Sequence, residues 1–305
     1  MKTFKFWFKA FRAHFFPASI VPVLLGTFLA GYETGEINWL FFTLVLVSAL
    51  ACHSGSNLIN DYYDHFIGTD EINQNRTVFN GGSGYIQNKL LPPDKFKSLA
   101  LICYIISFTA GLVLSFLCGY YTLFFTAAGI AAGYSYSGYP FFGCRGIGEL
   151  LVGLSFGPLI VTGAFFVQTG YISNTAVISS IPVGLLIAAV LYINQFPDYE
   201  ADGCCGKRNL VVKLGLKRAL PLFYFFIVGA YSTIAVGIVF KVIPFSAAAV
   251  FLTLPLAVRA VVTAKNYYFC PKKLLPASMY TVMTHLGLIL LLTVVFVWEM
   301  LTGRK

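Results

Sequence analysis

Residues 175–195, TAVISSIPVGLLIAAVLYINQ, form an apolar run without a charged side chain, and FPDYEADGCCGKRNLVVKLGLKR (196–218) follows directly. A bilayer core about 30 Å thick needs roughly 20 apolar residues per helix, so the first stretch predicts a membrane-spanning helix. The second stretch mixes carboxylates with lysine and arginine and predicts a polar loop at the membrane surface. This alternation of apolar run and polar loop decides the fold, because it recurs along the chain.

The composition places the whole chain in a membrane. Of its 305 residues, 58% are hydrophobic and 11% are charged, with a mean hydropathy of +0.77. A soluble domain has about a quarter of its residues charged, so the soluble enzyme classes are excluded. Nine apolar spans are predicted near 15–32, 38–58, 97–117, 119–137, 147–168, 175–195, 219–240, 243–263 and 277–301. We therefore expect one all-α, multi-pass domain over residues 1–305.

The basic side chains predict the orientation of this bundle. With a cytoplasmic N-terminus, 18 of the 21 Lys and Arg residues fall on the cytoplasmic side, and Lys241, Arg304 and Lys305 fall outside. Such an excess is the positive-inside pattern of membrane proteins. The two long polar loops, 59–96 and 196–218, then both face the cytoplasm. The net charge of +9 is thus a signal of topology, and no nucleic-acid partner is expected.

Carboxylates and amides gather where two of the spans end. The first cluster contains Asn57, Asn60, Asp61, Asp64, Asp70 and Glu71, and the second contains Asn194, Asp198, Glu200 and Asp202. A spacing of three or four residues puts side chains on one helical face, so Asn60 and Asp64 should converge, as should Asp198 and Asp202. Carboxylates at a membrane helix are costly unless they are paired, hydrated or metal-bound, and indicate function.

The residue types of these clusters predict a metal–diphosphate site. Mg²⁺ prefers oxygen ligands and commonly joins one or two carboxylates to substrate phosphates. Basic residues follow each cluster: Arg76 comes six residues after Asp70, and Lys207 and Arg208 follow Asp202. Such side chains suit phosphate oxygens. We therefore expect Mg²⁺ between the two clusters, with Arg76, Lys207 and Arg208 binding the diphosphate.

Several motifs together resemble the UbiA-type intramembrane prenyltransferases. NLINDYYDHFIGTD with NRTVFNGGSGYIQ is similar to the first aspartate-rich motif of that family, and NQFPDYEADGCCGKRNLVVKLG is similar to the second. PASIVPVLLGTFLAG and GYPFFGCRGIGELLVGLSFGPLIVTGAFFVQTG extend the resemblance over most of residues 12–218. The branch that the chain resembles most is that of the 1,4-dihydroxy-2-naphthoate prenyltransferases of menaquinone biosynthesis.

The resemblance implies a nine-helix bundle around a central cavity, in which two Mg²⁺ ions hold a polyprenyl diphosphate. It assigns catalytic roles to Asn60, Asp64, Asp198 and Asp202, and metal binding to these four with Asp61 and Asp70. Where many members have a third aspartate four residues after Asp64, this chain has Gly68. It also has Gln-Phe-Pro before Asp198, where naphthoate enzymes often have Asn-x-Arg. The expected location is the inner membrane of a bacterium, with membrane lipid around the bundle.

The expected reaction is electrophilic alkylation of an aromatic acceptor after the diphosphate departs. Aromatic faces can stabilise the allylic cation, and the candidates near cytoplasmic helix ends are Tyr62, Tyr63, Tyr134, Tyr136, Tyr139 and Tyr192. Asp198 or Asp202 is the expected base. The open alternatives are another acceptor (4-hydroxybenzoate, homogentisate, a chlorophyllide, haem or a glycerol phosphate lipid) and a cation-coupled transporter, which would place its acids near the bilayer midplane.

Two further features have both a structural and a functional interpretation. The segment Asn80–Gly84, NGGSG, could present backbone N–H groups to an anion or form an ordinary loop. His53 and His285 lie within apolar spans, and we expect both to be packing or hydrogen-bonding residues.

Overall fold

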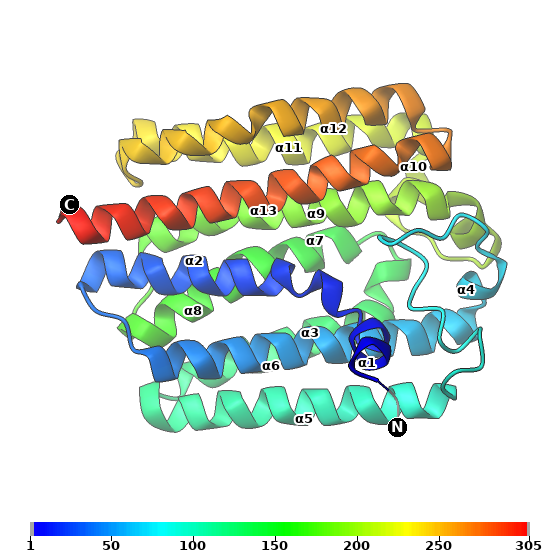
Figure 1. The fold of residues 1–305 in the computed structure, drawn as a ribbon, viewed down its shortest axis with the longest axis horizontal. Helices are drawn as coiled ribbons and strands as arrows, with labels where there is room; N and C mark the ends of the chain where they lie inside the picture. The colour runs from blue at the N-terminus through cyan, green and yellow to red at the C-terminus, as the bar shows by residue number, and fades with distance from the viewer. Residues whose placement is uncertain (1–2, 304–305) are drawn as a thin grey trace.

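The computed structural model describes residues 3–303, and all regular structure within them is helical. Long helices lie side by side along a common direction, so that the loops gather at the two ends of the bundle (Figure 1). Helices α11 and α12 form one edge and α5 the opposite edge. The helix α1 and the short helix α4 lie toward the same end of the bundle.

Eight helical segments of residues 3–303 are long and apolar enough to cross a membrane. They comprise α2 (Pro17–Thr34, preceded by a 3₁₀ turn at Ala13–Phe15), α3 (Trp39–Ile67), α5 (Pro93–Cys118), α7 with α8 (Gly148–Leu154 and Ile160–Thr169), α9 (Asn174–Cys204), α11 (Leu216–Val239), a 3₁₀ segment with α12 (Phe245–Thr253 and Leu254–Tyr267), and α13 (Pro271–Thr302). The remaining predicted span, 119–137, is α6 (Tyr121–Ser137). Its 17 residues rise about 26 Å, nearly the thickness of a bilayer core.

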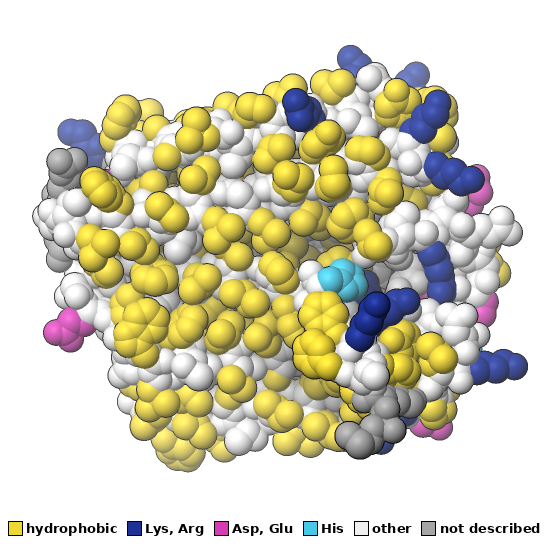
Figure 2. All heavy atoms as spheres, in the orientation of Figure 1, with side chains coloured by type: hydrophobic (Ala, Val, Ile, Leu, Met, Phe, Trp, Pro, Cys, Tyr) yellow, Lys and Arg dark blue, Asp and Glu magenta, His cyan; other side chains and the backbone are white. Residues whose placement is uncertain are grey.

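The surface agrees with a membrane environment. Hydrophobic side chains cover the middle of the bundle in Figure 2, whereas most of the Lys and Arg side chains in view gather at the end where α4 lies. Exposed residues on the long helices include Phe116, Phe124 and Leu252, which are 68–81% exposed. Apolar exposure on this scale would be costly in water and is expected against lipid tails.

The predicted loop boundaries are wrong at the beginning of both polar segments. Helix α3 continues nine residues beyond the predicted end of its span, to Ile67, and α9 continues to Cys204 through Pro197. Asp64 and Asp202 therefore lie on helices. The physical reason is that a helix can continue beyond the hydrocarbon core of the membrane. On α3, a hydrogen bond between residues i and i+4 (Asn60 Nδ2 to Asp64 Oδ2, 2.9 Å) stabilises the last turns.

Short helices lie outside the spans: α1 (Phe4–Ala10) precedes the first span, and α4 (Thr69–Ile72) and α10 (Leu210–Leu214) lie in the two long polar segments. A π-helical turn at Ser155–Leu159 separates α7 from α8. At this turn Gly157 lies against α9 so closely that a Cβ atom would come within 2.5 Å of the Gly184 nitrogen. The close approach fixes the π-helical turn against α9, beside the interior cavity.

Candidate active site

The ends of α3 and α9 that are predicted to face the cytoplasm lie opposite one another across a polar cavity of about 100 Å³. Asp64 and Asp70 line it from the first cluster, and Asp198 and Asp202 line it from the second. The structure therefore brings together the two clusters that the sequence predicted to converge. Because α3 and α9 both extend past their apolar stretches, their carboxylates meet at the end of the bundle, away from the membrane midplane.

On α3, the first cluster is held by its own helix and by the N-terminal segment. Asn60 donates to Asp64 and, at 3.1 Å, to the Ser137 hydroxyl at the end of α6. Arg12 donates to Asn60 Oδ1 at 3.0 Å and lies 3.3 Å from Asp61 Oδ1. The Ser83 backbone N–H donates to the other oxygen of Asp61 at 3.0 Å. Asp61 thus connects Arg12 with the 80–84 loop and lies beside the cavity.

On α9, asparagine amides hold the second cluster. Asn73 donates to Asp198 Oδ1 at 2.6 Å, and Asn80 donates to the same oxygen. Asn209, which caps α10, donates to Asp202 Oδ2 at 2.7 Å. These amides come from both polar loops, so the loops fold over the end of α9. Asn80 belongs to the NGGSG segment, which therefore contributes to the site through a side chain.

Lys207 links the two clusters. Its ammonium group lies 3.0 Å from Asp64 Oδ1 on α3 and 3.7 Å from Asp202 Oδ1 on α9. Burial alone would lower the pKa of Lys207, but the two carboxylates raise it well above its ordinary value. The side chain is therefore a fixed cation inside the cavity, at the place where negative charge from both helices meets.

Asp70 lines the same cavity, and Arg76, which does not line it, contacts Asp70 from outside. Arg76 donates to the Asp70 carbonyl and lies 3.7 Å from its carboxylate. Burial raises the pKa of Asp70 to about 7, and the repulsion from Asp64 and Asp61 acts in the same direction. Gly82 (φ +67°) crosses directly above, where a Cβ would come within 2.5 Å of Asp70 Oδ2. Only glycine permits both this backbone conformation and this approach.

The remaining predicted site residue, Arg208, has an exposed side chain and does not line the cavity, while its backbone N–H donates to the Cys144 carbonyl at 2.9 Å. Its role as a diphosphate partner stays a prediction. Among the lining residues that sequence reasoning missed, four donate hydrogen bonds to the two clusters: Arg12, Asn73, Asn80 and Asn209. The partners of Arg12, Asn73 and Asn80 are distant in sequence, whereas Asn209 contacts Asp202 seven residues before it. The one signal that the four share is that each lies in a polar segment next to a span.

The donors in the cavity fit Mg²⁺ in a particular way. They are carboxylate and amide oxygens, which Mg²⁺ prefers. Within residues 3–303, however, no three His, Cys, Asp or Glu side chains are grouped so as to enclose an ion by themselves. Mg²⁺ at phosphate sites is commonly held by one or two carboxylates, water and the substrate. The residues therefore fit ions shared between the protein and a phosphate-bearing ligand.

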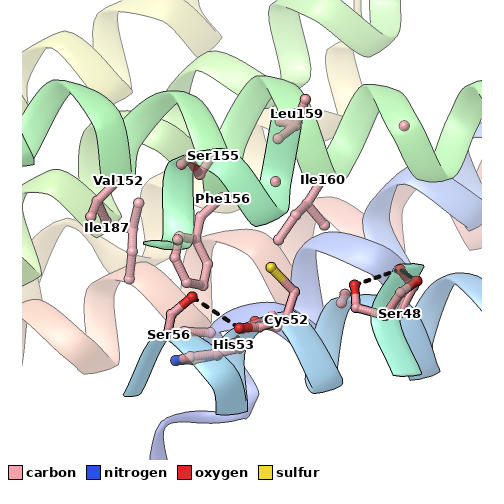
Figure 3. Close-up of a pocket in the computed structure, with 18 of the residues that line it drawn as sticks. Ser48, Cys52, His53, Ser56, Val152, Ser155, Phe156, Leu159, Ile160 and Ile187 are labelled. Atoms are coloured by element: carbon pink, nitrogen blue, oxygen red, sulfur yellow. Dashed lines mark hydrogen bonds between the residues drawn. The ribbon is translucent and has the colours of Figure 1, made fainter. Parts of the chain in front are cut away.

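A second, largely apolar cavity of about 310 Å³ adjoins the polar one (Figure 3). Arg12, Asn60, Phe79, Tyr136, Leu191 and Asn194 line both. One face of α3 runs along it, formed by Val45, Ser48, Ala49, Cys52, His53, Ser56, Asn57 and Asn60. The two cavities together can accept a molecule with an anionic head and an apolar tail. Of the six predicted shielding tyrosines, Tyr136 is the one lining this junction.

Two curated proteins have sequences similar to that of this chain over most of its length. The 1,4-dihydroxy-2-naphthoate octaprenyltransferase of Bacillus subtilis (strain 168) is 32% identical over 255 residues, covering 82% of this chain and 79% of that protein. The 2-carboxy-1,4-naphthoquinone phytyltransferase of Synechocystis sp. is 27% identical over 285 residues, covering 93% of this chain and 90% of that protein.

Solved structures share the fold at low sequence identity. A UbiA homolog from Archaeoglobus fulgidus bound to DMAPP and Mg²⁺ has a TM-score of 0.67 and 16% identity, covering 94% of this chain and 99% of that one. The apo structure of a UbiA homolog from Aeropyrum pernix K1 has a TM-score of 0.67 and 14% identity, covering 91% and 98%. The model of the UbiA prenyltransferase family matches residues 19–281. Since this match spans most of the chain, and its helices suit a bilayer, the protein belongs to the UbiA prenyltransferase family and is an integral-membrane prenyltransferase.

Proposed function

We propose that this prenyltransferase uses Mg²⁺ to transfer an isoprenyl chain from a polyprenyl diphosphate to 1,4-dihydroxy-2-naphthoate, a step of menaquinone biosynthesis. The observation that carries the proposal is the pair of joined cavities, one polar and lined by carboxylates from α3 and α9, the other apolar and beside α3. The diphosphate fits the first and the isoprenyl chain the second, which sets the scissile C–O bond near Asn60, Tyr136 and Asn194.

Charge balance supports two Mg²⁺ ions. The cavity and its rim hold five carboxylates and three cations: Asp61, Asp64, Asp70, Asp198 and Asp202 against Arg12, Arg76 and Lys207. The site therefore has a formal excess of negative charge before any diphosphate enters it. An anionic head group adds to that excess, which more than one divalent cation would offset. The structures of the Archaeoglobus fulgidus homolog with DMAPP or GPP and Mg²⁺ support the same assignment of ligand and metal.

The residues of this chain have distinct tasks in the proposed reaction. Asn60, Asp64, Asp198 and Asp202 would hold the metal, with Asp61 and Asp70 beside them. Mg²⁺, when bound, offsets charge that develops on the departing diphosphate. Lys207 and Arg76 donate to the diphosphate oxygens, which keep the electron pair of the broken C–O bond.

The allylic carbon that remains is shielded from water by Tyr136, whose ring face can also stabilise the positive charge. The acceptor ring attacks that carbon and then loses a proton to restore aromaticity. Asp198 or Asp202, whichever the metal leaves unsaturated, would take up that proton, and each is held in place by an asparagine amide.

The relatives support a carboxylated two-ring acceptor, because one is named for a naphthoate and the other for a carboxylated naphthoquinone. The charge pattern supports the topology, with the N-terminus and the site on the cytoplasmic side of a bacterial inner membrane. An aromatic acid is water-soluble and anionic, so it would approach from that side. The isoprenyl diphosphate would insert its tail from the lipid. The whole chain would act as a single domain.

The test is transfer by the purified protein in detergent with Mg²⁺, farnesyl or geranylgeranyl diphosphate, and a panel of aromatic acids. We expect prenylated naphthoate as the main product. Asp198→Ala should abolish it, whereas Glu200→Ala, on an exposed side chain two residues along α9, should leave it unchanged. Transfer to 4-hydroxybenzoate or homogentisate in place of naphthoate would refute the acceptor, and full turnover by Asp198→Ala would refute the metal site.

A further inference from the structure

The apolar cavity contains a hydrogen-bonding group that an isoprenyl chain cannot use. His53 lines it from the middle of α3 and is half-buried. Its Nδ1 lies 2.8 Å from the Ser19 hydroxyl on α2, which fixes the orientation of the imidazole ring. Among the described residues, no group forms a hydrogen bond with Nε2. In either tautomer, Nε2 therefore remains a donor or an acceptor for a ligand.

Two aromatic rings pack against this imidazole. Phe156 stands edge-on to it, with centroids 5.2 Å apart and planes at 84°, and Phe16 lies 5.8 Å away. Figure 3 shows Phe156 reaching from the opposite wall toward His53 and Ser56. Flat aromatic side chains around one polar atom are suited to a flat, oxygen-bearing ligand.

The π-helical turn explains why Phe156 reaches this point. Ser155, Phe156, Leu159 and Ile160 all line the cavity, and three of them belong to the turn at Ser155–Leu159. The additional residue of a π-helical turn shifts which side chains face inward, and such turns are frequent at functional sites. A regular α-helix would be sufficient to line an apolar channel for a hydrocarbon chain, without a π-helical turn.

The position of His53 relative to the carboxylates fits a bound ring. His53 precedes Asn60 by seven residues on the same face of α3, about 10 Å along the helix axis. A ring system lying between them is next to the place where the scissile bond would lie. A hydroxyl or carboxyl group on the far side of that ring then reaches Nε2.

We propose that His53, oriented by Ser19, binds an oxygen substituent of the aromatic acceptor, whose ring lies against Phe156. The inference rests on the proposed function and refines it, because it assigns part of the apolar cavity to the acceptor. The isoprenyl chain would then follow the remainder, past Ser48 toward Leu114 and Val167.

The experiment compares three variants in detergent with Mg²⁺, geranylgeranyl diphosphate and 1,4-dihydroxy-2-naphthoate. His53→Leu keeps the bulk and removes the hydrogen bond, and His53→Gln restores a polar group at a similar reach. Ser54→Ala is the matched control, because Ser54 is the next residue of α3 but lies off the cavity wall and donates to the Leu50 carbonyl of its own helix. Binding of the non-reactive fluorescent analogue 1-hydroxy-2-naphthoate is measured alongside the two KM values.

We expect His53→Leu to raise the KM of the acceptor, and the Kd of the analogue, by about tenfold, the usual effect of one lost hydrogen bond with its partner left unsatisfied. The KM of the prenyl diphosphate should stay within about twofold, His53→Gln should recover most of the loss, and Ser54→Ala should have no effect. An unchanged acceptor KM, or equal rises in both KM values, would overturn the assignment of His53. Absence of transfer by the wild-type protein would instead refute the proposed function.

Discussion

Replacing Lys207 by methionine tests the electrostatics of the site most directly. The ammonium group contacts Asp64 at 3.0 Å and Asp202 at 3.7 Å. At an effective dielectric constant of about 20, each contact is worth roughly 5 kcal/mol before desolvation is subtracted. The net value of a charge-assisted hydrogen bond is about 1.5–3 kcal/mol. If Lys207 transfers this contact to the diphosphate, its loss should raise the KM of the prenyl diphosphate about 10- to 150-fold.

The same substitution should act in the opposite direction on the metal. Without Lys207, Asp64 and Asp202 lose the cation that the protein supplies, so Mg²⁺ alone should bind more tightly by calorimetric titration. Lys213→Met is the control, because Lys213 is exposed and donates to the Arg145 carbonyl, away from the carboxylates. The reasoning is refuted if Lys207→Met leaves both quantities unchanged, or if Lys213→Met changes them equally.

Three further predictions concern the loop, pH and topology. Gly82→Ala should reduce kcat/KM at least tenfold, because a positive φ strains an alanine by about 1–3 kcal/mol and the new Cβ would collide with Asp70. Gly35→Ala is the control: it also has a positive φ (+87°) but no atom within 4 Å of the new Cβ, and it should retain activity. With Mg²⁺ removed by EDTA, burial holds the pKa of Asp70 at about 7 in the folded protein, so the protonated side chain stabilises the fold at low pH and this contribution is lost as the pH rises through 7. Asp70→Asn should therefore reduce the loss of folding stability between pH 5 and 8 by about 3 kcal/mol. An unaltered pH profile of thermal inactivation would contradict this. A membrane-impermeant maleimide should label the exposed Cys204 in inside-out vesicles, and Cys204→Ser should be labelled less, since Cys205 beside it is partly exposed. Labelling of Cys204 from the outer face would reverse the topology.

The apolar spans and the two carboxylate clusters could be predicted from the sequence because each depends on a local pattern. Twenty apolar residues in a row require a bilayer, and Asp198 and Asp202 at i, i+4 share a helical face whatever lies beyond them. Where α3 and α9 end could not be predicted, because this depends on contacts that stabilise the last turns, such as the bond from Asn60 to Ser137 on α6.

The contacts that complete the site are not local. Arg12 reaches Asn60 across 48 residues, and Asn80 reaches Asp198 across 118. Nothing in the sequence near Arg12 distinguishes it from the other basic residues of the N-terminus. His53 was expected to be a packing or hydrogen-bonding residue, and its bond to Ser19 confirms the second. Its place on the cavity wall follows from the spacing to Asn60, which becomes informative only once the cavity is known.

One face of α3 sets a fixed length along the apolar cavity. The lining residues run from Val45 to Asn60, a rise of about 22 Å, which is most of the thickness of a bilayer core. In the proposed reaction the reacting end of the ligand would lie at the Asn60 end of this face, so an extended tail would run along a rigid wall of that length. A tail longer than this face of α3 must fold back or leave the cavity between helices, whereas a shorter tail leaves part of the cavity unfilled. Changing the side chain at position 45 or 48 would therefore alter which chain length fits, without touching the carboxylates.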